Sequence, residues 1–573
     1  MKKPDTNLSP VERIKARSDF LRGTLVASLA DSATGALAED DTQLSKFHGF
    51  YQQDNRDLRE DRRRRLLEPD YQFMIRARVP GGVCTPGQWL KLDEIARLWA
   101  NGTLRLTTRQ AFQLHGVLKR DLKNSIRAIN DSLLDTIAAC GDVNRNVMSS
   151  AVPEHSALHR EVHDLARAVS SHLTPRTTAY HEIWLSDGGP RQRVAGSAVP
   201  DAEPLYGPVY LPRKFKMAFA VPPRNDVDVF AHDLGFIAIA DKNVLAGFNV
   251  TVGGGMGMTQ ADPATYPRLA EVIGFCKPEQ VLAVSEAVLT LQRDYGDRTN
   301  RKHARLKYTI DDRGLDWFRA EFERRLGDSL AAARPWEFSD NGDRYGWQEG
   351  DDGLWHLGLF IENGRIADHP GAEHLSGLRE IAKRLEGEIR LTPNQNLVLA
   401  NVPPAQRADI DALVRAHGLD GFRQASPLRL HAMACVGLPT CGLAMAESER
   451  YLPELVGRIE ASMAGHGLGR EAITIRMTGC PNGCARPYLA EIGLVGKGPG
   501  LYDLFLGAAF DGARLNRKYR ESVRENDVLD LLDELFGAFV SDRKTGEHFG
   551  DYLLRAGFLD DCAAPGPGRD VPL

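Results

Sequence analysis

The sequence predicts an α+β fold organised around an internal duplication. From about residue 71 onward, short runs of β-branched and aromatic residues alternate with amphipathic helical segments, the pattern of mixed sheets covered by helices. A stretch at 105–114, which begins Arg-Leu-Thr and has Gln at its sixth position, returns at 390–399 with both features intact. Copies this far apart indicate two equivalent halves around a shared site, not a solenoid.

Each half is predicted to be a strand-helix-strand unit. In the first, a strand at 71–79 is followed by Pro-Gly-Gly and a helix at 90–99. In the second, a strand at 357–362 is followed by Asn-Gly and a helix at 376–385. The repeated ten-residue stretch then closes each unit.

A weaker correspondence predicts a second duplicated pair. The basic strand expected at 211–220, with the later glycines 253–255, resembles 473–477 with the later Gly-Lys-Gly at 496–498. Duplication of this kind predicts architecture and leaves the chemistry open.

The first 70 residues form a polar arm in which acidic and basic residues are interleaved. The four arginines 62–65 follow Glu60-Asp61, a pattern typical of a solvated helix. We expect an exposed, mobile arm. Nucleic-acid binding is disfavoured because the acids interrupt the positive charge and few aromatic residues are available for stacking.

The composition is that of a globular protein with several domains. The chain has 573 residues, 42% of them hydrophobic, and a formal net charge of only -5. No overall field therefore favours nucleic acid or a membrane surface as partner. No segment reads as a signal peptide or a bilayer-spanning run, so we expect a cytoplasmic protein.

Four of the eight cysteines cluster late in the chain, as Cys435-x5-Cys441 and Cys480-x3-Cys484. Pro-Thr in the first loop and Pro-Asn-Gly in the second favour tight turns that present paired thiolates, which are soft ligands for iron-sulfur clusters or zinc. Four buried structural cysteines and a zinc site remain the alternatives, although zinc pairs are usually spaced by two to four residues. We interpret the others as ordinary packed or surface thiols: Cys84, Cys140, Cys276 and Cys562.

Cations are unusually dense at several predicted strand ends. Arg76 and Arg78 precede Pro-Gly-Gly, and Lys214 and Lys216 are two apart, so each pair would share one face of a strand and one anion. Arg145 lies between two asparagines. Taken singly, such residues are often solvated edge positions.

The segments 433–441 and 478–484 resemble the signature of the sulfite and nitrite reductase family. The similarity extends from 48–54 to 549–552 and is greatest to the beta, or hemoprotein, subunits of the NADPH-dependent enzymes. The resemblance implies that the four clustered cysteines hold one [4Fe-4S] cluster and that Cys484 also ligates the iron of one sirohaem.

The resemblance also implies three mixed α/β lobes that follow an N-terminal arm at 1–70. Paired ferredoxin-like halves would comprise 71–137 and 340–412. A first sirohaem-binding lobe would span 138–339, and a second lobe, carrying the cluster, would span 413–573.

Further residue roles follow from the resemblance. It assigns sulfite binding to Arg76, Arg145, Lys214 and Lys216. It assigns sirohaem carboxylate contacts to Arg105, Arg109, Gln113 and His115. For His115 the alternative is a satisfied core histidine at a strand end.

The implied activity is the six-electron reduction of sulfite to sulfide in assimilatory sulfate reduction and cysteine biosynthesis. The glycines at 253–257 lack the dinucleotide-binding spacing, so electrons would come from an FAD- and FMN-containing alpha subunit in a hetero-oligomer, with ferredoxin as the other known type of donor. Sirohaem nitrite reduction and a non-catalytic metal-binding protein are the competing functions.

Overall fold

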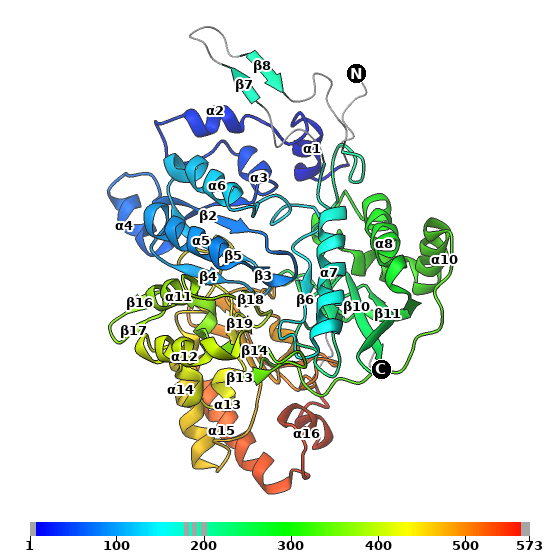
Figure 1. Ribbon diagram of the computed structural model, residues 1–573, viewed down its shortest axis with the longest axis vertical. Helices are drawn as coiled ribbons and strands as arrows, with labels where there is room; N and C mark the ends of the chain where they lie inside the picture. The colour runs from blue at the N-terminus through cyan, green and yellow to red at the C-terminus, as the bar shows by residue number, and fades with distance from the viewer. Residues whose placement is uncertain (1–6, 177–182, 186–191, 196–202, 563–573) are drawn as a thin grey trace.

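The computed structural model describes residues 7–176, 183–185, 192–195 and 203–562, and its ribbon shows helices covering several mixed sheets (Figure 1). One large hydrophobic core runs through the elements from Leu21 to Leu419. A second core, between Leu428 and Leu559, belongs to the C-terminal lobe.

Two five-stranded antiparallel sheets are built from the two predicted halves, and each borrows one short strand from the other. The first sheet has the order β1 (Phe50–Asp54), β2 (Tyr71–Ala77), β5 (Phe112–Val117), β4 (Leu104–Leu106), β15 (Arg365–Ile366). The second has the order β13 (Gly346–Glu349), β14 (Trp355–Leu359), β19 (Leu397–Val402), β18 (Glu388–Leu391), β3 (Val83–Cys84). Because β3 and β15 are exchanged, neither half is a separate unit.

The other two large sheets share a second topology, with three parallel strands followed by two antiparallel ones. One has the order β6 (Met148–Ser149), β9 (Met217–Ala220), β10 (Leu234–Asp241), β11 (Val244–Val252), β12 (Glu271–Cys276). Its counterpart has the order β20 (Ala432–Ala434), β21 (Ile475–Thr478), β22 (Ile492–Gly498), β23 (Leu501–Leu506), β24 (Arg517–Val523). Two-stranded pairs are formed by β7 (Ile183–Leu185) with β8 (Gln192–Ala195) and by β16 (Asp368–His369) with β17 (Ala372–Glu373).

Helices pack on these sheets in equivalent places. Those of the paired halves are α5 (Pro86–Trp99), α6 (Leu122–Asp131), α11 (His374–Ala382) and α12 (Arg407–Ala416). Those of the other two lobes include α7 (Ser156–His172), α8 (Val281–Tyr295), α9 (Leu306–Arg313), α10 (Leu315–Leu326), α13 (Pro427–Leu430), α14 (Leu452–Gly465), α15 (Glu525–Asp542) and α16 (Phe549–Arg555). The predicted α+β fold with an internal duplication is therefore confirmed.

The predicted helix at 90–99 begins earlier than its apolar pattern indicated. Thr85 caps α5: its hydroxyl accepts from the Gln88 backbone N–H at 3.2 Å, and the Gln88 side chain accepts from the Thr85 N–H at 2.9 Å. Pro86 fits the first helical turn because its missing N–H has no helical partner there. This capping box sets the start of the helix at Pro86.

The expected strand at 211–220 is shorter than predicted. Regular pairing begins only at Met217, and Phe215 forms an isolated bridge with Asn144. Lys214 and Lys216 therefore lie in a loop on either side of that bridge, not on a strand. The weaker duplication is confirmed for β9 and β21, but the glycines after 252 follow β11, whereas 496–498 end β22, so those glycine runs are not equivalent.

The N-terminal region differs from the exposed arm that its composition predicted. The region forms three short helices, α1 (Pro10–Ala16), α2 (Leu25–Ala30) and α3 (Asp41–Leu44). Helices α2 and α3 bury Leu25 and Leu44 in the large core, and α1 packs the half-buried Ile14 against it. Only the arginine-rich α4 (Arg59–Arg64) is a solvated helix, since none of its residues is buried. Apolar residues spaced irregularly among charges, such as Leu21 and Phe47, supply the packing.

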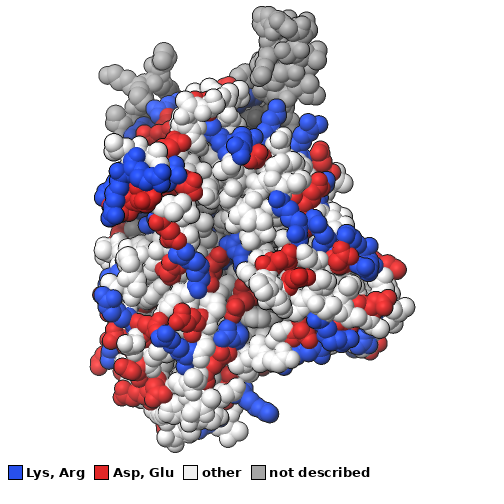
Figure 2. Space-filling view, turned by 90° about the vertical axis from the view of Figure 1, so that its left-hand side faces the viewer, with Lys and Arg blue, Asp and Glu red and all other residues white. Residues whose placement is uncertain are grey.

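The glycines at 253–257 follow β11 and do not open a helix; a loop and then β12 come after them. Among the described residues, no helix is both long and apolar enough to cross a membrane. On the face shown in Figure 2, positive and negative side chains are interleaved.

Candidate functional site

The four clustered cysteines come together at one end of the C-terminal lobe. Cys435 directly follows β20 and Cys480 comes two residues after β21, and these strands are parallel neighbours, so both thiols lie at the same sheet edge. Cys480 is buried, Cys435 and Cys441 are half-buried, and Cys484 is exposed. Within the described ranges, no three His, Cys, Asp or Glu side chains are arranged to hold a single metal ion.

The thiols influence one another electrostatically. Burial raises the pKa of Cys435 to about 12, and Cys484 and Cys441 add to the effect. Burial and then Cys484 likewise raise the pKa of Cys480 to about 11. The Gly479 N–H donates to Cys435 Sγ at 3.3 Å and Asn482 Nδ2 donates to Cys480 Sγ at 3.4 Å, so donors already face sulfurs that a bound cluster would hold as thiolates.

The two lysines of the predicted anion site lie close to Cys484. Burial lowers the pKa of Lys214 and of Lys216 well below the ordinary lysine value, neighbouring cations lower both further, and Cys484 acts in the opposite direction on each. No hydrogen bond or ion pair engages either Nζ within the described part of the chain. Unpaired ammonium groups in such a desolvated place are suited to binding an anion.

The two predicted arginines join this group through the loop before β6. Arg76 Nη1 donates to the Ala139 carbonyl at 3.3 Å, and Arg145 Nη1 donates to the same oxygen at 3.4 Å. Arg145 also donates from Nε to the Gly141 carbonyl at 2.8 Å. Arg78 is directed elsewhere, because it pairs with Asp135 at 2.6 Å, so the expected sharing of one anion by Arg76 and Arg78 is wrong.

Gln113 and His115, both on β5, lie beside Arg76 of the neighbouring strand β2. With its amide oriented to suit both neighbours, Gln113 accepts from Arg76 Nε at 3.2 Å and donates to His115 Nε2 at 3.3 Å. His115 is buried with no partner at Nδ1, and burial, Arg365 and Arg105 lower its pKa well below the ordinary value, so the ring is neutral. A buried Nδ1–H without an acceptor is better explained by a hydrogen bond to a bound cofactor than by a structural role for His115 in the core.

Arg105 and Arg109 are held differently. Arg105 pairs with Glu449 at 2.6 Å and donates to the Ala434 carbonyl at 3.0 Å, next to Cys435, so it already ties the first half to the cysteine lobe. Arg109 donates to the Met217 carbonyl at 3.2 Å, while its Nε is buried without a partner. The four-thiol set, the two free lysines and these orphaned donors fit a [4Fe-4S] cluster and a polycarboxylate haem.

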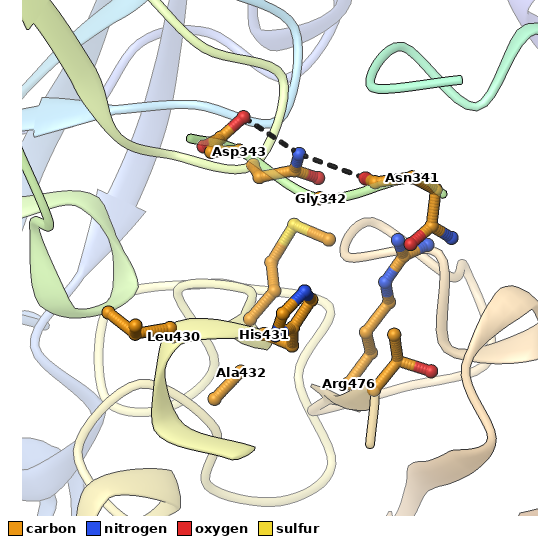
Figure 3. Close-up of a pocket in the computed structure, with 10 residues that line it drawn as sticks. Asn341, Gly342, Asp343, Leu430, His431, Ala432 and Arg476 are labelled. Carbon is orange, nitrogen blue, oxygen red and sulfur yellow. Dashed lines mark hydrogen bonds between the residues drawn. The ribbon is translucent and has the colours of Figure 1, made fainter. Parts of the chain in front are cut away.

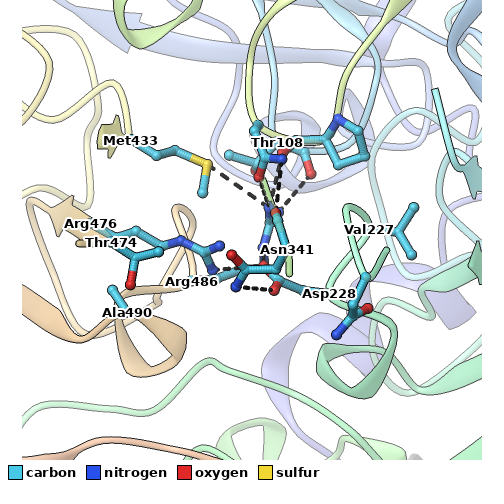
Figure 4. Close-up of polar contacts among 12 residues, drawn as sticks. Thr108, Val227, Asp228, Asn341, Met433, Thr474, Arg476, Arg486 and Ala490 are labelled. Atoms are coloured by element: carbon cyan, nitrogen blue, oxygen red, sulfur yellow. Dashed lines mark hydrogen bonds and ion pairs between the residues drawn. The ribbon is translucent and has the colours of Figure 1, made fainter. Parts of the chain in front are cut away.

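Sequence reasoning missed Arg486, which lies two residues after Cys484. Arg486 Nη1 donates to the Thr108 carbonyl at 3.0 Å and Nη2 to the Pro393 carbonyl at 3.0 Å, so it contacts both copies of the repeat (Figure 4). Its Nε pairs with buried Asp228, and Arg476 Nη1 binds the same carboxylate at 2.6 Å. The only signal in the sequence was the position of Arg486, two residues after Cys484, because its partner Asp228 is distant in sequence.

Two further residues near Arg76 were also missed. Cys140, which we interpreted as an ordinary thiol, is buried and accepts from Arg76 Nη1 at 3.3 Å. Burial and Cys140 raise the pKa of Tyr51 to about 12. A small cavity of about 10 Å³, which lies between Asn341, His431 and Arg476, has room only for a water-sized molecule and is no substrate site (Figure 3).

Comparisons with known proteins agree with this geometry. Residues 65–132 and 348–417 match the nitrite/sulfite reductase ferredoxin-like half domain, and 166–330 match the nitrite and sulphite reductase 4Fe-4S domain. The chain therefore belongs to the nitrite and sulfite reductase family of oxidoreductases. The two half-domain matches agree with the duplication seen in the sheets.

Several proteins that are similar over nearly their full length are named sulfite reductase [NADPH] hemoprotein beta-component. The Myxococcus xanthus protein is 60% identical, over 97% of this chain and 98% of the relative. The Bacillus subtilis protein is 55% identical, over 98% and 97%. The solved structure of Mycobacterium tuberculosis NirA protein superposes with a TM-score of 0.77 at 25% identity and covers 97% of this chain and 98% of NirA.

The predicted cofactors agree with these descriptions, one of which specifies a 4Fe-4S domain and the other a hemoprotein. The matched 4Fe-4S segment, 166–330, does not contain the four clustered cysteines. It includes β9 to β12, whose strand order is repeated in the sheet that carries Cys435 and Cys480. Lobes of one topology thus carry different parts of the candidate site, because Lys214 and Lys216 precede β9 whereas the clustered cysteines follow β20 and β21.

Proposed function

We propose that this chain is the catalytic hemoprotein subunit of an assimilatory sulfite reductase and converts sulfite to sulfide with six electrons. The observation that carries the proposal is the pair of unpartnered lysines, Lys214 and Lys216, within electrostatic range of Cys484. The names of relatives at 55–60% identity support the same activity.

In this proposal Cys435, Cys441, Cys480 and Cys484 hold the [4Fe-4S] cluster, and Cys484 also ligates the iron of sirohaem. The cofactors supply the electron transfer that side chains cannot perform. Arg109 Nε and His115 Nδ1, both buried without partners, are available to the haem carboxylates. Arg105 would contribute through its remaining donors while keeping its pair with Glu449.

The cations would bind and neutralise the substrate. Sulfite carries two negative charges close to neutral pH, and Arg76 and Arg145 approach it from one side of the loop that includes Ala139. Charge-assisted hydrogen bonds from guanidinium and ammonium groups favour this binding and draw electron density onto the sulfite oxygens.

The lysines would also deliver protons. Each oxygen lost from sulfite leaves as water and needs two protons, so a group that releases protons near neutral pH is required. Burial lowers the pKa of both Lys214 and Lys216 well below the ordinary lysine value, so they release protons more readily, whereas arginine stays protonated. Lysine and arginine therefore have different tasks in one cluster.

The electrons would come from a separate flavoprotein. The relatives are described as beta-components of NADPH enzymes, which supports a hetero-oligomer with an alpha subunit that carries FAD and FMN. Sulfide made in this way would enter cysteine biosynthesis, and we place the complex in the cytoplasm.

The test is an optical spectrum of protein purified from cells that make sirohaem, with iron and acid-labile sulfide assayed on the same sample. We expect sirohaem bands, about five irons and about four sulfides per chain. Turnover with a chemically reduced dye is then compared for sulfite and nitrite. A colourless zinc protein would overturn the proposal, and a higher kcat/KM for nitrite would reassign the chain as a nitrite reductase.

A further inference from the structure

The backbone just before the cationic loop is held by three cations, of which Lys15 is buried and Arg298 and Arg301 are half-buried. Three consecutive carbonyl oxygens, those of residues 210–212, each accept a hydrogen bond from a different side chain. The donors, in the order of the acceptors, are Arg298 Nη2 at 2.7 Å, Lys15 Nζ at 2.8 Å and Arg301 Nη1 at 3.3 Å. One of the three, Lys15, comes from α1 in the N-terminal region.

Two buried carboxylates balance these cations. Glu12, also on α1, pairs with Lys15 and with Arg298, the latter at 2.6 Å. Asp142 binds Arg301 at 2.7 and 2.9 Å and lies 3.6 Å from Lys15 Nζ. The side chains of Lys15, Glu12 and Asp142 are 0%, 2% and 2% exposed, so the centre of the network is removed from water, whereas Arg298 and Arg301 lie at its partly exposed edge.

The network favours the charged form of Asp142. Burial alone would raise the pKa of Asp142, but Arg301 and Lys15 outweigh it and hold that pKa below the ordinary value. Removing one partner from a buried ionic network leaves an uncompensated charge, which is strongly unfavourable. The carbonyls of 210–212 therefore have little freedom to move while the network is intact.

The held backbone leads directly to the anion-binding side chains. The Leu211 N–H donates to the Asp142 carbonyl at 3.0 Å, and the Phe215 N–H donates to the Val143 carbonyl at 3.1 Å. The Arg145 N–H in turn donates to the Phe215 carbonyl at 2.9 Å. Residues 142–145 and 211–215, which carry Arg145 and Lys214, thus form one unit with Asp142 at its start.

We propose that Glu12 and Lys15 are positioning residues for the sulfite-binding loop, and that α1 acts on substrate affinity from behind this loop. The inference rests on the proposed function, because it concerns the same anion site. Neither residue is directed at the substrate: Lys15 acts through the Leu211 carbonyl and Asp142, and Glu12 acts through Lys15 and Arg298. An N-terminal region that composition marks as an exposed arm would therefore be part of the site's framework.

The test uses the full-length holoprotein with Lys15→Met and, as a matched control on the same helix, Arg13→Met, whose side chain is exposed. The first measurement is hydrogen-deuterium exchange of peptides that cover 208–218. The second is the Kd of sulfite from an optical titration of the haem. For Lys15→Met we expect exchange of this segment and the sulfite Kd each to rise roughly tenfold or more, since one charge-assisted hydrogen bond is lost. Arg13→Met should match the parent in both.

Glu12→Gln provides a second variant, because it keeps the shape of the side chain and removes only its charge. We expect a smaller rise in the sulfite Kd and a smaller rise in hydrogen-deuterium exchange, with the change in exchange confined to the peptides that cover 208–218. Wild-type values for both Lys15→Met and Glu12→Gln would overturn the inference. Faster exchange spread over the whole chain would overturn it too, since Glu12 and Lys15 would then serve general stability.

The two proposals fail differently. If the parent protein does not reduce sulfite, the proposed function fails, yet the exchange of 208–218 still reports whether α1 holds this loop. If the parent reduces sulfite and the variants match Arg13→Met, only the positioning role fails.

Discussion

Replacement of Lys216 by methionine separates proton delivery from anion binding. Lys216 Nζ makes no hydrogen bond or ion pair within the described structure that the substitution would break, and methionine fills a similar volume, so the fold should be retained. Burial and the neighbouring Lys214 and Arg109 lower the pKa of Lys216 well below its usual value, so its ammonium group releases a proton more readily than that of an ordinary lysine.

The expected magnitudes differ for the two steps. Loss of a positioned general acid lowers kcat by about 10²–10⁴. Loss of one charge-assisted hydrogen bond is worth about 1.5–3 kcal/mol, but Lys214, Arg76 and Arg145 remain, so we expect the sulfite Kd to rise by the lower limit, about tenfold. Dye-driven turnover and an optical sulfite titration measure kcat and Kd separately.

Two companion variants sharpen the test. Lys216→Arg keeps the positive charge but cannot release a proton near neutral pH, so binding should recover while kcat stays low. Lys302→Met removes an exposed lysine, 58% accessible, and should change neither value. Unchanged turnover in Lys216→Met would refute the role of Lys216, and full activity in Lys216→Arg would refute the proton transfer.

Three further predictions concern stability and cofactor content. Asp228→Ala leaves two buried arginines unpaired and should lower the free energy of unfolding in urea by about 3–5 kcal/mol. Asp57→Ala, which breaks an exposed pair, should cost about 1 kcal/mol or less, and equal effects would contradict the assigned burial. Cys435→Ser should lose most acid-labile sulfide while the sheet structure seen by circular dichroism remains; a full sulfide content would remove Cys435 from the ligand set. Burial raises the pKa of Glu491 to about 7. Between the pKa of Glu491 in the unfolded chain and pH 7, the folded state therefore binds more protons than the unfolded state, and the free energy of unfolding should fall as pH rises through this window. In Glu491→Gln that slope should be absent, and a slope equal to the parent's would assign it to another group.

Local patterns in the sequence predicted the parts of the site that are close together in the chain. The spacing around Cys435 and Cys484 indicated a cluster, and the two-residue separation of Lys214 and Lys216 indicated a shared anion, although both lysines lie in a loop. These signals are short-range, because turn residues and side-chain alternation act over a few positions.

Long-range pairing was not accessible in the same way. Glu12 and Lys15 look like surface charges in a polar segment, and only folding places them beside Asp142. Asp228 likewise has no local feature that marks it as the partner of Arg486. Buried ion pairs of this kind depend on tertiary contacts that no hydrophobic period encodes.

The repeat itself has a structural element that both copies retain. Gln110 and Gln395 occupy the same position in the two copies, and both have a positive φ, 49° and 71°. Their side chains act differently: Gln110 Nε2 crosses to the other half and donates to the Leu391 carbonyl at 2.8 Å, whereas Gln395 Nε2 donates to the Asn363 carbonyl of its own half at 3.2 Å. The two copies therefore share the backbone conformation at this glutamine, and in the first copy its side chain also joins the halves.

The residue before that glutamine is one of the positions at which the copies differ. It is Arg109 in the first copy and Asn394 in the second. Arg109 has an unpartnered Nε, whereas Asn394 is engaged with Asp343 at 3.0 Å and receives a hydrogen bond from Arg486 at 3.3 Å. Arg486 contacts both repeat loops and lies two residues after Cys484, so the two equivalent loops together hold the backbone near this cysteine. The position that differs, Arg109 in one copy and Asn394 in the other, supplies a cation from the first copy only. A duplicated scaffold can thus hold one site whose chemistry is not duplicated.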